Sequence, residues 1–161
     1  MKGVLIFIFF FYSSLFYGRD DVDIYRKLLI LANENIQYAK MFYDQFNKPT
    51  NENSPTIMGY KAMSYFMMSK HVLNPYNKLM YFKKGKLCID KAIVLDANNV
   101  ELLYLRYCVQ INVPKFLNYH NNISIDKKKI ELYLQSNSNV QKLSSDFLNK
   151  IKQTLNKIPQ N

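Results

Sequence analysis

The chain has 161 residues, a length that fits a single domain. Hydrophobic residues make up 48% of it and charged residues 21%, a composition typical of a globular rather than a disordered protein. Four glycines and five prolines are too few for the many tight turns of an all-β sandwich or barrel. The formal net charge of +10 could favour nucleic acid or an anionic membrane surface. Because lysine is spread along the chain and arginine occurs only at Arg19, Arg26 and Arg106, we expect no nucleic-acid partner, while an anionic membrane surface stays open.

The N-terminus has the layout of a secretory signal peptide. Lys2 supplies a positive charge, residues 4–17 are almost continuously apolar or aromatic, and charged residues begin directly after Gly18. The apolar run is shorter than the roughly 20 residues with which a helix spans a bilayer, so a retained transmembrane anchor is the weaker alternative. We expect residues 1–18 to be a signal peptide, its cleavage site left open, and residues 19–161 to form one helical domain. Such a protein would be exported to the periplasm or the cell surface.

Three helices are predicted in the first part of the chain. Apolar residues recur at three- and four-residue spacing over 20–46, which predicts one long helix. The polar stretch 48–53 predicts a loop, after which Ser54 and Pro55 provide the N-cap and first position of a second helix ending near residue 71. A third helix is predicted over 75–95.

The second part of the chain predicts three further helices. The segment 100–111 is apolar on nearly all sides, which is typical of a central helix. Residues 115–124 are expected to be irregular, followed by helices over 126–135 and 140–158. No convincing strand pairs are found. The sequence therefore predicts an all-α protein, an antiparallel array of about six helices with short connections.

The end of the third predicted helix resembles the second half of a tetratricopeptide repeat. Ile89, Ala92 and the turn Leu95-Asp96-Ala97-Asn98 occupy the places of an apolar residue, a small residue and a Leu-Asp-Pro-Asn turn. Ala97 stands where the family has proline, and the 34-residue period does not recur. The stretch 106–117 also resembles a group of uncharacterised exported proteins of the Bacteroidetes type. The resemblance implies helical hairpins that bind a peptide or protein partner.

Two cysteines lie at similar distances from the turn 96–99. If the helices 75–95 and 100–111 form an antiparallel hairpin, Cys88 and Cys108 lie at the same height. Export permits a disulfide, but its Cα atoms must lie about 4.4–6.8 Å apart, whereas packed helix axes lie about 8–10 Å apart. The alternative is two buried, reduced thiols.

No motif for catalysis, a cofactor or a metal is found. His71 and His120 have no cysteine or carboxylate at metal-ligand spacing, and no nucleophile elbow or glycine-rich phosphate loop is present. Arg106, in the most apolar helix, is expected to pair with a carboxylate such as Glu34 or Asp90, or else to bind a ligand. We therefore expect a protein without enzymatic activity, cofactor or metal.

The segment 112–122 is the best candidate for a recognition surface, because it mixes aromatic and hydrogen-bonding side chains between two helices. The alternative is that its apolar residues pack inward against the core. The leading hypothesis is a protein or peptide partner in the cell envelope. The second is an accessory factor held on an anionic membrane by its basic residues, and the third is a hydrolase of unrecognised type. The candidate partner-binding residues are Arg106, Gln110, Asn112, Lys115, Phe116, Tyr119, His120 and Asn122.

Overall fold

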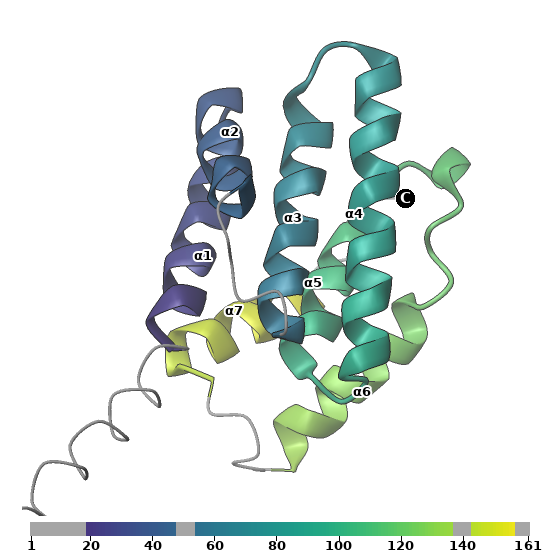
Figure 1. Cartoon of the computed structure of the whole chain (residues 1–161). Helices are drawn as coiled ribbons and strands as arrows, with labels where there is room; N and C mark the ends of the chain where they lie inside the picture. Colours follow the sequence, from purple (N-terminus) through teal and green to yellow (C-terminus); the bar gives the residue numbers. More distant parts are fainter. Residues whose placement is uncertain (1–18, 48–53, 137–142, 157–161) are drawn as a thin grey trace, which may run out of the picture.

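The computed structural model describes residues 19–47, 54–136 and 143–156, and within these residues the chain is helical without a strand (Figure 1). The predicted all-α class is confirmed. The predicted signal peptide lies outside the described residues, as do residues 140–142 and 157–158 of the last predicted helix. The predicted start of that helix at residue 140 is wrong, because the side chain of Ser144 caps a helix that begins at Ser145. The elements are α1 (Arg19–Ala32), α2 (Ile36–Asp44), the 3-10 helix η1 (Gln45–Asn47), α3 (Pro55–His71), α4 (Pro75–Leu95), α5 (Val100–Gln110), the 3-10 helix η2 (Lys115–Leu117), α6 (Ile123–Gln135) and α7 (Ser145–Leu155).

The prediction of one helix over 20–46 is wrong, because the chain turns back after Ala32. Asn35 takes an extended conformation, and its side chain accepts a hydrogen bond from the backbone N–H of Tyr38 at 3.1 Å, which caps α2. The apolar spacing continues across the turn because both helices bury one face against α3. Ala39 and Phe42 of α2, for example, are fully buried.

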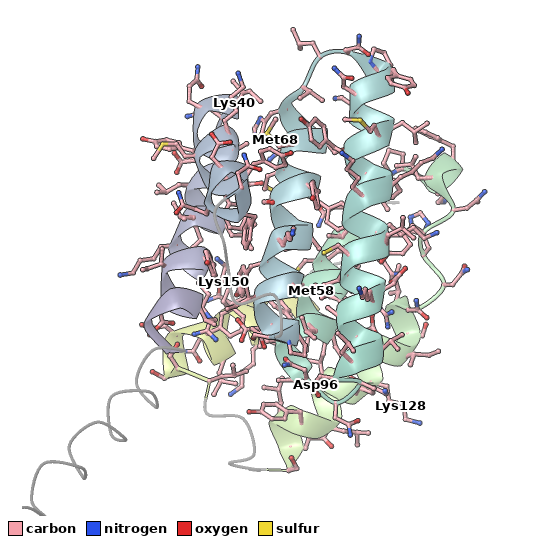
Figure 2. All side chains as sticks on the ribbon, in the orientation of Figure 1. Lys40, Met58, Met68, Asp96, Lys128 and Lys150 are labelled. Atoms are coloured by element: carbon pink, nitrogen blue, oxygen red, sulfur yellow. The ribbon has the colours of Figure 1, made fainter. Side chains whose placement is uncertain are left out.

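The two longest helices, α3 and α4, form an antiparallel hairpin (Figure 1). Both begin as the sequence predicts, with the side chains of Ser54 and Asn74 capping the helices at Pro55 and Pro75. Gly85 permits the close approach of the two helices. A Cβ atom there would lie 3.0 Å from the Phe66 ring and 3.1 Å from the Ala62 carbonyl oxygen. Met58 and Met68 mark the two ends of α3 (Figure 2).

Helix α5 lies at the centre of the molecule, as its apolar pattern predicts. Every residue from Val100 to Leu105 is buried. It packs chiefly on α6 and α3, and less on α4. Gly59 of α3 comes so close that an added Cβ would lie 2.3 Å from Cδ2 of Leu102. On another side the ring of Tyr104 meets Phe147 of α7 edge-on at 5.5 Å.

The connection from α5 to α6 is mostly irregular, as expected, but it contains η2 and is shorter than predicted. Asn118 ends η2 in the left-handed conformation, at a φ of 48°, which asparagine tolerates better than most residues. Helix α6 then begins at Ile123, three residues before the predicted start. Among the described residues, no helix is long and apolar enough to cross a membrane.

Candidate functional site

The face of α4 opposite the core exposes large apolar side chains. Leu87 and Val94 lie one above the other at i and i+7, and they remain 74% and 82% exposed. Three exposed lysines, Lys83, Lys84 and Lys91, surround them. We call these five residues the outer α4 surface. Large apolar side chains in register on a helix, with charged side chains beside them, are typical of a docking face. Asp90, one turn from both and partly exposed, is already bound by Tyr119 and Arg106.

The segment 112–122 lies against one flank of α4. The hydroxyl of Tyr119 donates a hydrogen bond to Asp90 of α4 at 2.9 Å. The ammonium of Lys86, one turn earlier, lies 5.0 Å from the centre of the same ring. These contacts hold the loop beside the outer α4 surface, and Figure 1 shows η2 to the side of α4.

Some side chains of η2 and of the residues after it are exposed to solvent, and others are buried. Phe116 is 78% exposed and Lys115 is exposed, whereas Leu117 is half-buried and Tyr119 is buried. The alternative that the apolar residues of this segment pack against the core therefore applies to Tyr119 and in part to Leu117. Only Lys115 and Phe116 of the predicted recognition residues combine exposure with a side chain able to anchor a partner.

Arg106 is the centre of a buried ion-pair network. Its guanidinium donates two hydrogen bonds of 2.8 Å to the carboxylate of Asp126, which is fully buried, and a third of 3.4 Å to Asp90. Burial alone would lower the pKa of Arg106, but the hydrogen bonds and charge of Asp126 outweigh it, so the pKa lies above its ordinary value. Asp90 was one of the two predicted partners, whereas Glu34 is exposed in the turn after α1. The closer partner, Asp126, was not predicted.

The remaining predicted residues serve mainly local structure. The amide of Asn112 donates to the Cys108 carbonyl at 2.7 Å, and a ring nitrogen of His120 lies 3.0 Å from the Val113 carbonyl. Asn122 precedes α6 without a side-chain capping bond.

Gln110 differs from the other predicted residues because it is buried without a polar partner. Its side chain is fully buried, and neither amide atom has a hydrogen-bond partner among the described residues. Burial removes the side chain of Gln110 from any partner at the surface.

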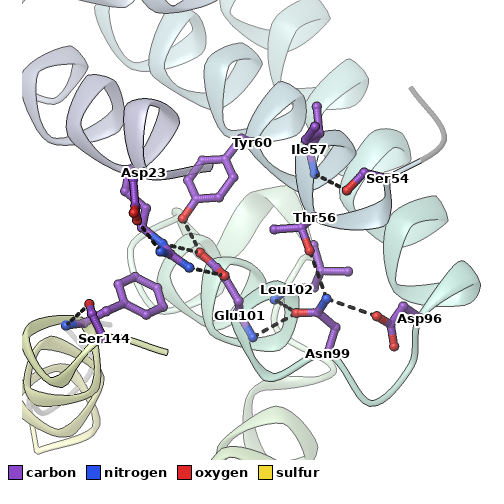
Figure 3. A network of polar contacts seen from close by, with 12 residues as sticks. Asp23, Ser54, Thr56, Ile57, Tyr60, Asp96, Asn99, Glu101, Leu102 and Ser144 are labelled. Carbon is purple, nitrogen blue, oxygen red and sulfur yellow. Dashed lines mark hydrogen bonds and ion pairs between the residues drawn. The ribbon is translucent and has the colours of Figure 1, made fainter. Parts of the chain in front are cut away.

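A second buried carboxylate, which the sequence did not reveal as a site, lies at the start of α5 (Figure 3). The carboxylate of Glu101 accepts hydrogen bonds of 2.8 and 2.7 Å from Arg26 of α1 and one of 2.5 Å from the hydroxyl of Tyr60 of α3. The guanidinium also lies 4.8 Å from the centre of the Phe147 ring. Burial and the negative charge of Glu101 raise the pKa of Tyr60, so its hydroxyl stays protonated and donates. This cluster ties four helices together.

Asn99 organises the turn between α4 and α5. Its side-chain oxygen accepts from the backbone N–H groups of Glu101 and Leu102, and its amide nitrogen donates to Thr56 and Asp96, each at 3.0 Å (Figure 3). One side chain thus joins the start of α3, the end of α4 and the start of α5.

Cys88 and Cys108 are half-buried thiols. The Cys88 thiol donates to the Met58 carbonyl of α3 at 3.3 Å. Cys108 interacts with the hydroxyl of Tyr104, whose pKa is raised by burial and then by this neighbour. The structure describes two thiols rather than a disulfide, and the disulfide stays a prediction.

The part of the chain that the structure describes contains no cluster of three or more histidine, cysteine or acidic side chains that could hold a metal ion. His71, at the end of α3, lies 2.9 Å from the Ala32 carbonyl, whereas His120 lies in the connection between α5 and α6.

No family model, curated protein or solved structure matches the chain. The likeness to a tetratricopeptide repeat and to the Bacteroidetes group stays a prediction from the sequence.

Proposed function

We propose that this protein is an exported, non-catalytic binding protein, and that a protein or peptide partner docks on the outer α4 surface. The observation that carries the proposal is the exposure of Leu87 and Val94 in helical register on the longest described helix. Covering an exposed side chain of this size contributes about 1.5–3 kcal/mol, so an uncovered pair favours a partner.

The charges around this pair indicate the chemistry of the partner. Lys83, Lys84 and Lys91 lie exposed beside Leu87 and Val94. A helix with an apolar row and acidic residues on both sides would cover the leucine and valine while its carboxylates meet the lysines. We therefore propose an acidic amphipathic helix as the part of the partner that docks.

A non-catalytic role agrees with the use of the buried charges. Glu101 and Asp126 each accept two hydrogen bonds from one arginine, and both carboxylates are buried. A general acid or base must reach its substrate within hydrogen-bond distance, and these carboxylates are enclosed by the helices that they join. They are therefore assigned to structural pairing.

Site-specific photocrosslinking tests the proposal. A photoreactive phenylalanine in place of Leu87 should give one discrete adduct in the cell envelope, and Val94→Glu in the same chain should abolish it. The matched control is the same photoreactive residue at Leu132 of α6, which is also exposed. The adduct's sequence should contain an acidic amphipathic helix. Equal adducts from positions 87 and 132, or an adduct that Val94→Glu leaves unchanged, would exclude the outer α4 surface as the docking site.

A further inference from the structure

A different part of the α3–α4 hairpin, its loop end, carries a separate set of exposed groups. At this end the α3–α4 loop lies beside the turn between α1 and α2. The ammonium of Lys70 donates to the carbonyl and side-chain oxygens of Asn33, at 2.9 and 2.6 Å, and His71 contacts the Ala32 carbonyl. Met68 and Lys40 lie near this end in Figure 2, and Asp96 and Lys128 lie near the opposite end.

The tip of the loop presents large apolar side chains to solvent. Leu73 is 94% exposed and Tyr76 77%, and Leu79 one turn into α4 is also exposed. Ile30 in the last turn of α1 is exposed as well. We call Leu73, Tyr76 and Leu79 the hairpin tip.

The backbone beneath the hairpin tip is held in place. The hydroxyl of Ser69 donates to the Lys78 carbonyl at 2.8 Å, which ties the end of α3 to the start of α4. Asn74 accepts from the N–H groups of Tyr76 and Asn77 at 2.9 and 3.3 Å. Hydrogen bonds therefore hold the backbone on both sides of Leu73, and Leu73 is exposed because the folded loop directs it to solvent.

The loop end of the hairpin carries lysines without nearby acidic residues in the same segment. Residues 54–89 contain six lysines and no aspartate or glutamate. Lys70 lies in the last turn of α3, and Lys78 lies between Tyr76 and Leu79. Both are exposed, and the ammonium of Lys78 donates to the Lys70 carbonyl at 3.4 Å. At the same end Lys40 adds a third positive charge, against the exposed carboxylate of Glu34. The occupant of this end must therefore combine negative charge with an apolar layer.

We propose that the hairpin tip docks on an anionic lipid bilayer, with Leu73 and Tyr76 at the boundary between headgroups and acyl chains and with Lys70 and Lys78 on the lipid phosphates. Three exposed apolar side chains at the end of a hairpin fit a broad, flat surface. A tyrosine ring suits the interface itself, and lysine stems lie along apolar surface while the ammonium stays with the headgroups. The protein thus lies on the membrane through this end, which leaves the outer α4 surface available to its partner.

Tryptophan fluorescence of the full-length chain tests this inference, because the chain has no tryptophan of its own. The variant Leu73→Trp places one fluorophore at the hairpin tip, and we call it the tip reporter. The variant Leu132→Trp is the matched control reporter, because Leu132 lies on α6, outside both proposed surfaces, and is 54% exposed.

Both reporters are titrated with phosphatidylcholine vesicles, with and without phosphatidylglycerol. With the anionic vesicles, the emission of the tip reporter should shift to shorter wavelength and be quenched by brominated acyl chains. The emission of the control reporter should do neither. Because each fluorophore reports only on its own surroundings, an attachment through residues 1–18 does not produce this result.

Lysine variants of the tip reporter test the charge. Lys70→Gln and Lys78→Gln should each weaken its response about fivefold, since one lysine near an anionic surface contributes about that factor. Lys128→Gln, at the opposite end of the molecule, should change the response little. High salt should weaken the response of the tip reporter in the same direction.

Three outcomes would overturn the inference. The first is vesicle binding without a shift of the tip reporter, and the second is an equal shift of the tip and control reporters. The third is a response of the tip reporter to soluble polyglutamate as large as its response to vesicles, which would assign the end to an acidic polypeptide. None of these outcomes changes the crosslinking expected at Leu87. The proposal for the hairpin tip and the proposal for the outer α4 surface can therefore fail independently.

Discussion

The buried pair between Arg26 and Glu101 makes a quantitative prediction about stability. In Arg26→Met, the carboxylate of Glu101 loses two hydrogen bonds of 2.8 and 2.7 Å and keeps only the 2.5 Å bond from Tyr60. Removing one partner of a buried ion pair costs about 3–5 kcal/mol, because an uncompensated charge remains inside. The side chain of Arg26 is 20% exposed, which lets some water reach the vacated site, so we expect about 3 kcal/mol.

Urea unfolding followed by circular dichroism measures this loss of unfolding free energy. Asp23→Asn is the matched control, because Asp23 pairs with the same guanidinium but is largely exposed, and its loss should cost no more than about 0.5 kcal/mol. The double variant Arg26→Met with Glu101→Met should recover most of the stability lost in Arg26→Met, since no buried charge is left unpaired. A cost below about 1 kcal/mol for Arg26→Met, or a double variant less stable than Arg26→Met, would refute the reasoning.

Three further predictions concern packing, an unpaired amide and alkaline pH. Gly59→Val should lower the unfolding free energy by about 2–3 kcal/mol, because even a single added carbon would overlap a neighbouring leucine; urea unfolding again reports it. Gln110→Met should raise the melting temperature, since it removes an unpartnered buried amide that costs about 1–3 kcal/mol; an unchanged or lower melting temperature would contradict this. Burial raises the pKa values of Tyr60, Tyr104 and Tyr119, so above about pH 10 the unfolded chain loses protons that the folded chain retains. Stability is therefore present below about pH 10 and should fall by about 1.4 kcal/mol per pH unit for each tyrosine, which urea titrations from about pH 9 to pH 11 would measure.

Helix boundaries that rest on local chemistry could be predicted from the sequence. Ser54-Pro55 and Asn74-Pro75 begin α3 and α4 as expected, because capping depends on residues within one turn. The break between α1 and α2 could not be seen in the same way. Asn35 caps α2, but both helices bury the same kind of face against α3, so the apolar spacing runs on through the turn.

The charged pairs could not be predicted, because their partners are set by tertiary packing. Arg106 stood out as a cation in an apolar helix, yet its closest carboxylate, Asp126, lies 20 residues away on α6. Glu101 gave no signal, because an acidic residue in the first turn of a helix is ordinary in any exposed helix. Glu101 becomes part of a buried pair only because α1 and α3 pack over this turn.

The candidate site was predicted in part. The segment 112–122 alternates aromatic and polar residues, and this pattern does not tell which aromatic ring turns inward. In the structure Tyr119 reaches Asp90 and Phe116 remains in solvent. The outer α4 surface was not predicted, because an apolar residue in a helix is ordinarily expected to face the core. Leu87 and Val94 lie within the predicted helix over 75–95. Helical spacing places them opposite the buried residues Phe82, Ile89 and Ile93, so the sequence contained a signal for this surface.

The distribution of the two basic residue types connects the interior with the surface proposals. Arg26 and Arg106 are both committed to buried carboxylates, where the fork of donors on a guanidinium binds two oxygens at once. The positive charge left on the outside of the hairpin is then lysine, a flexible point charge that does not fix the geometry of its partner. Such a surface favours partners whose negative charge is spread out, such as a lipid headgroup layer or an acidic helix. Binding at both the hairpin tip and the outer α4 surface should therefore depend steeply on salt, with orientation supplied by Leu73, Tyr76 and Leu87.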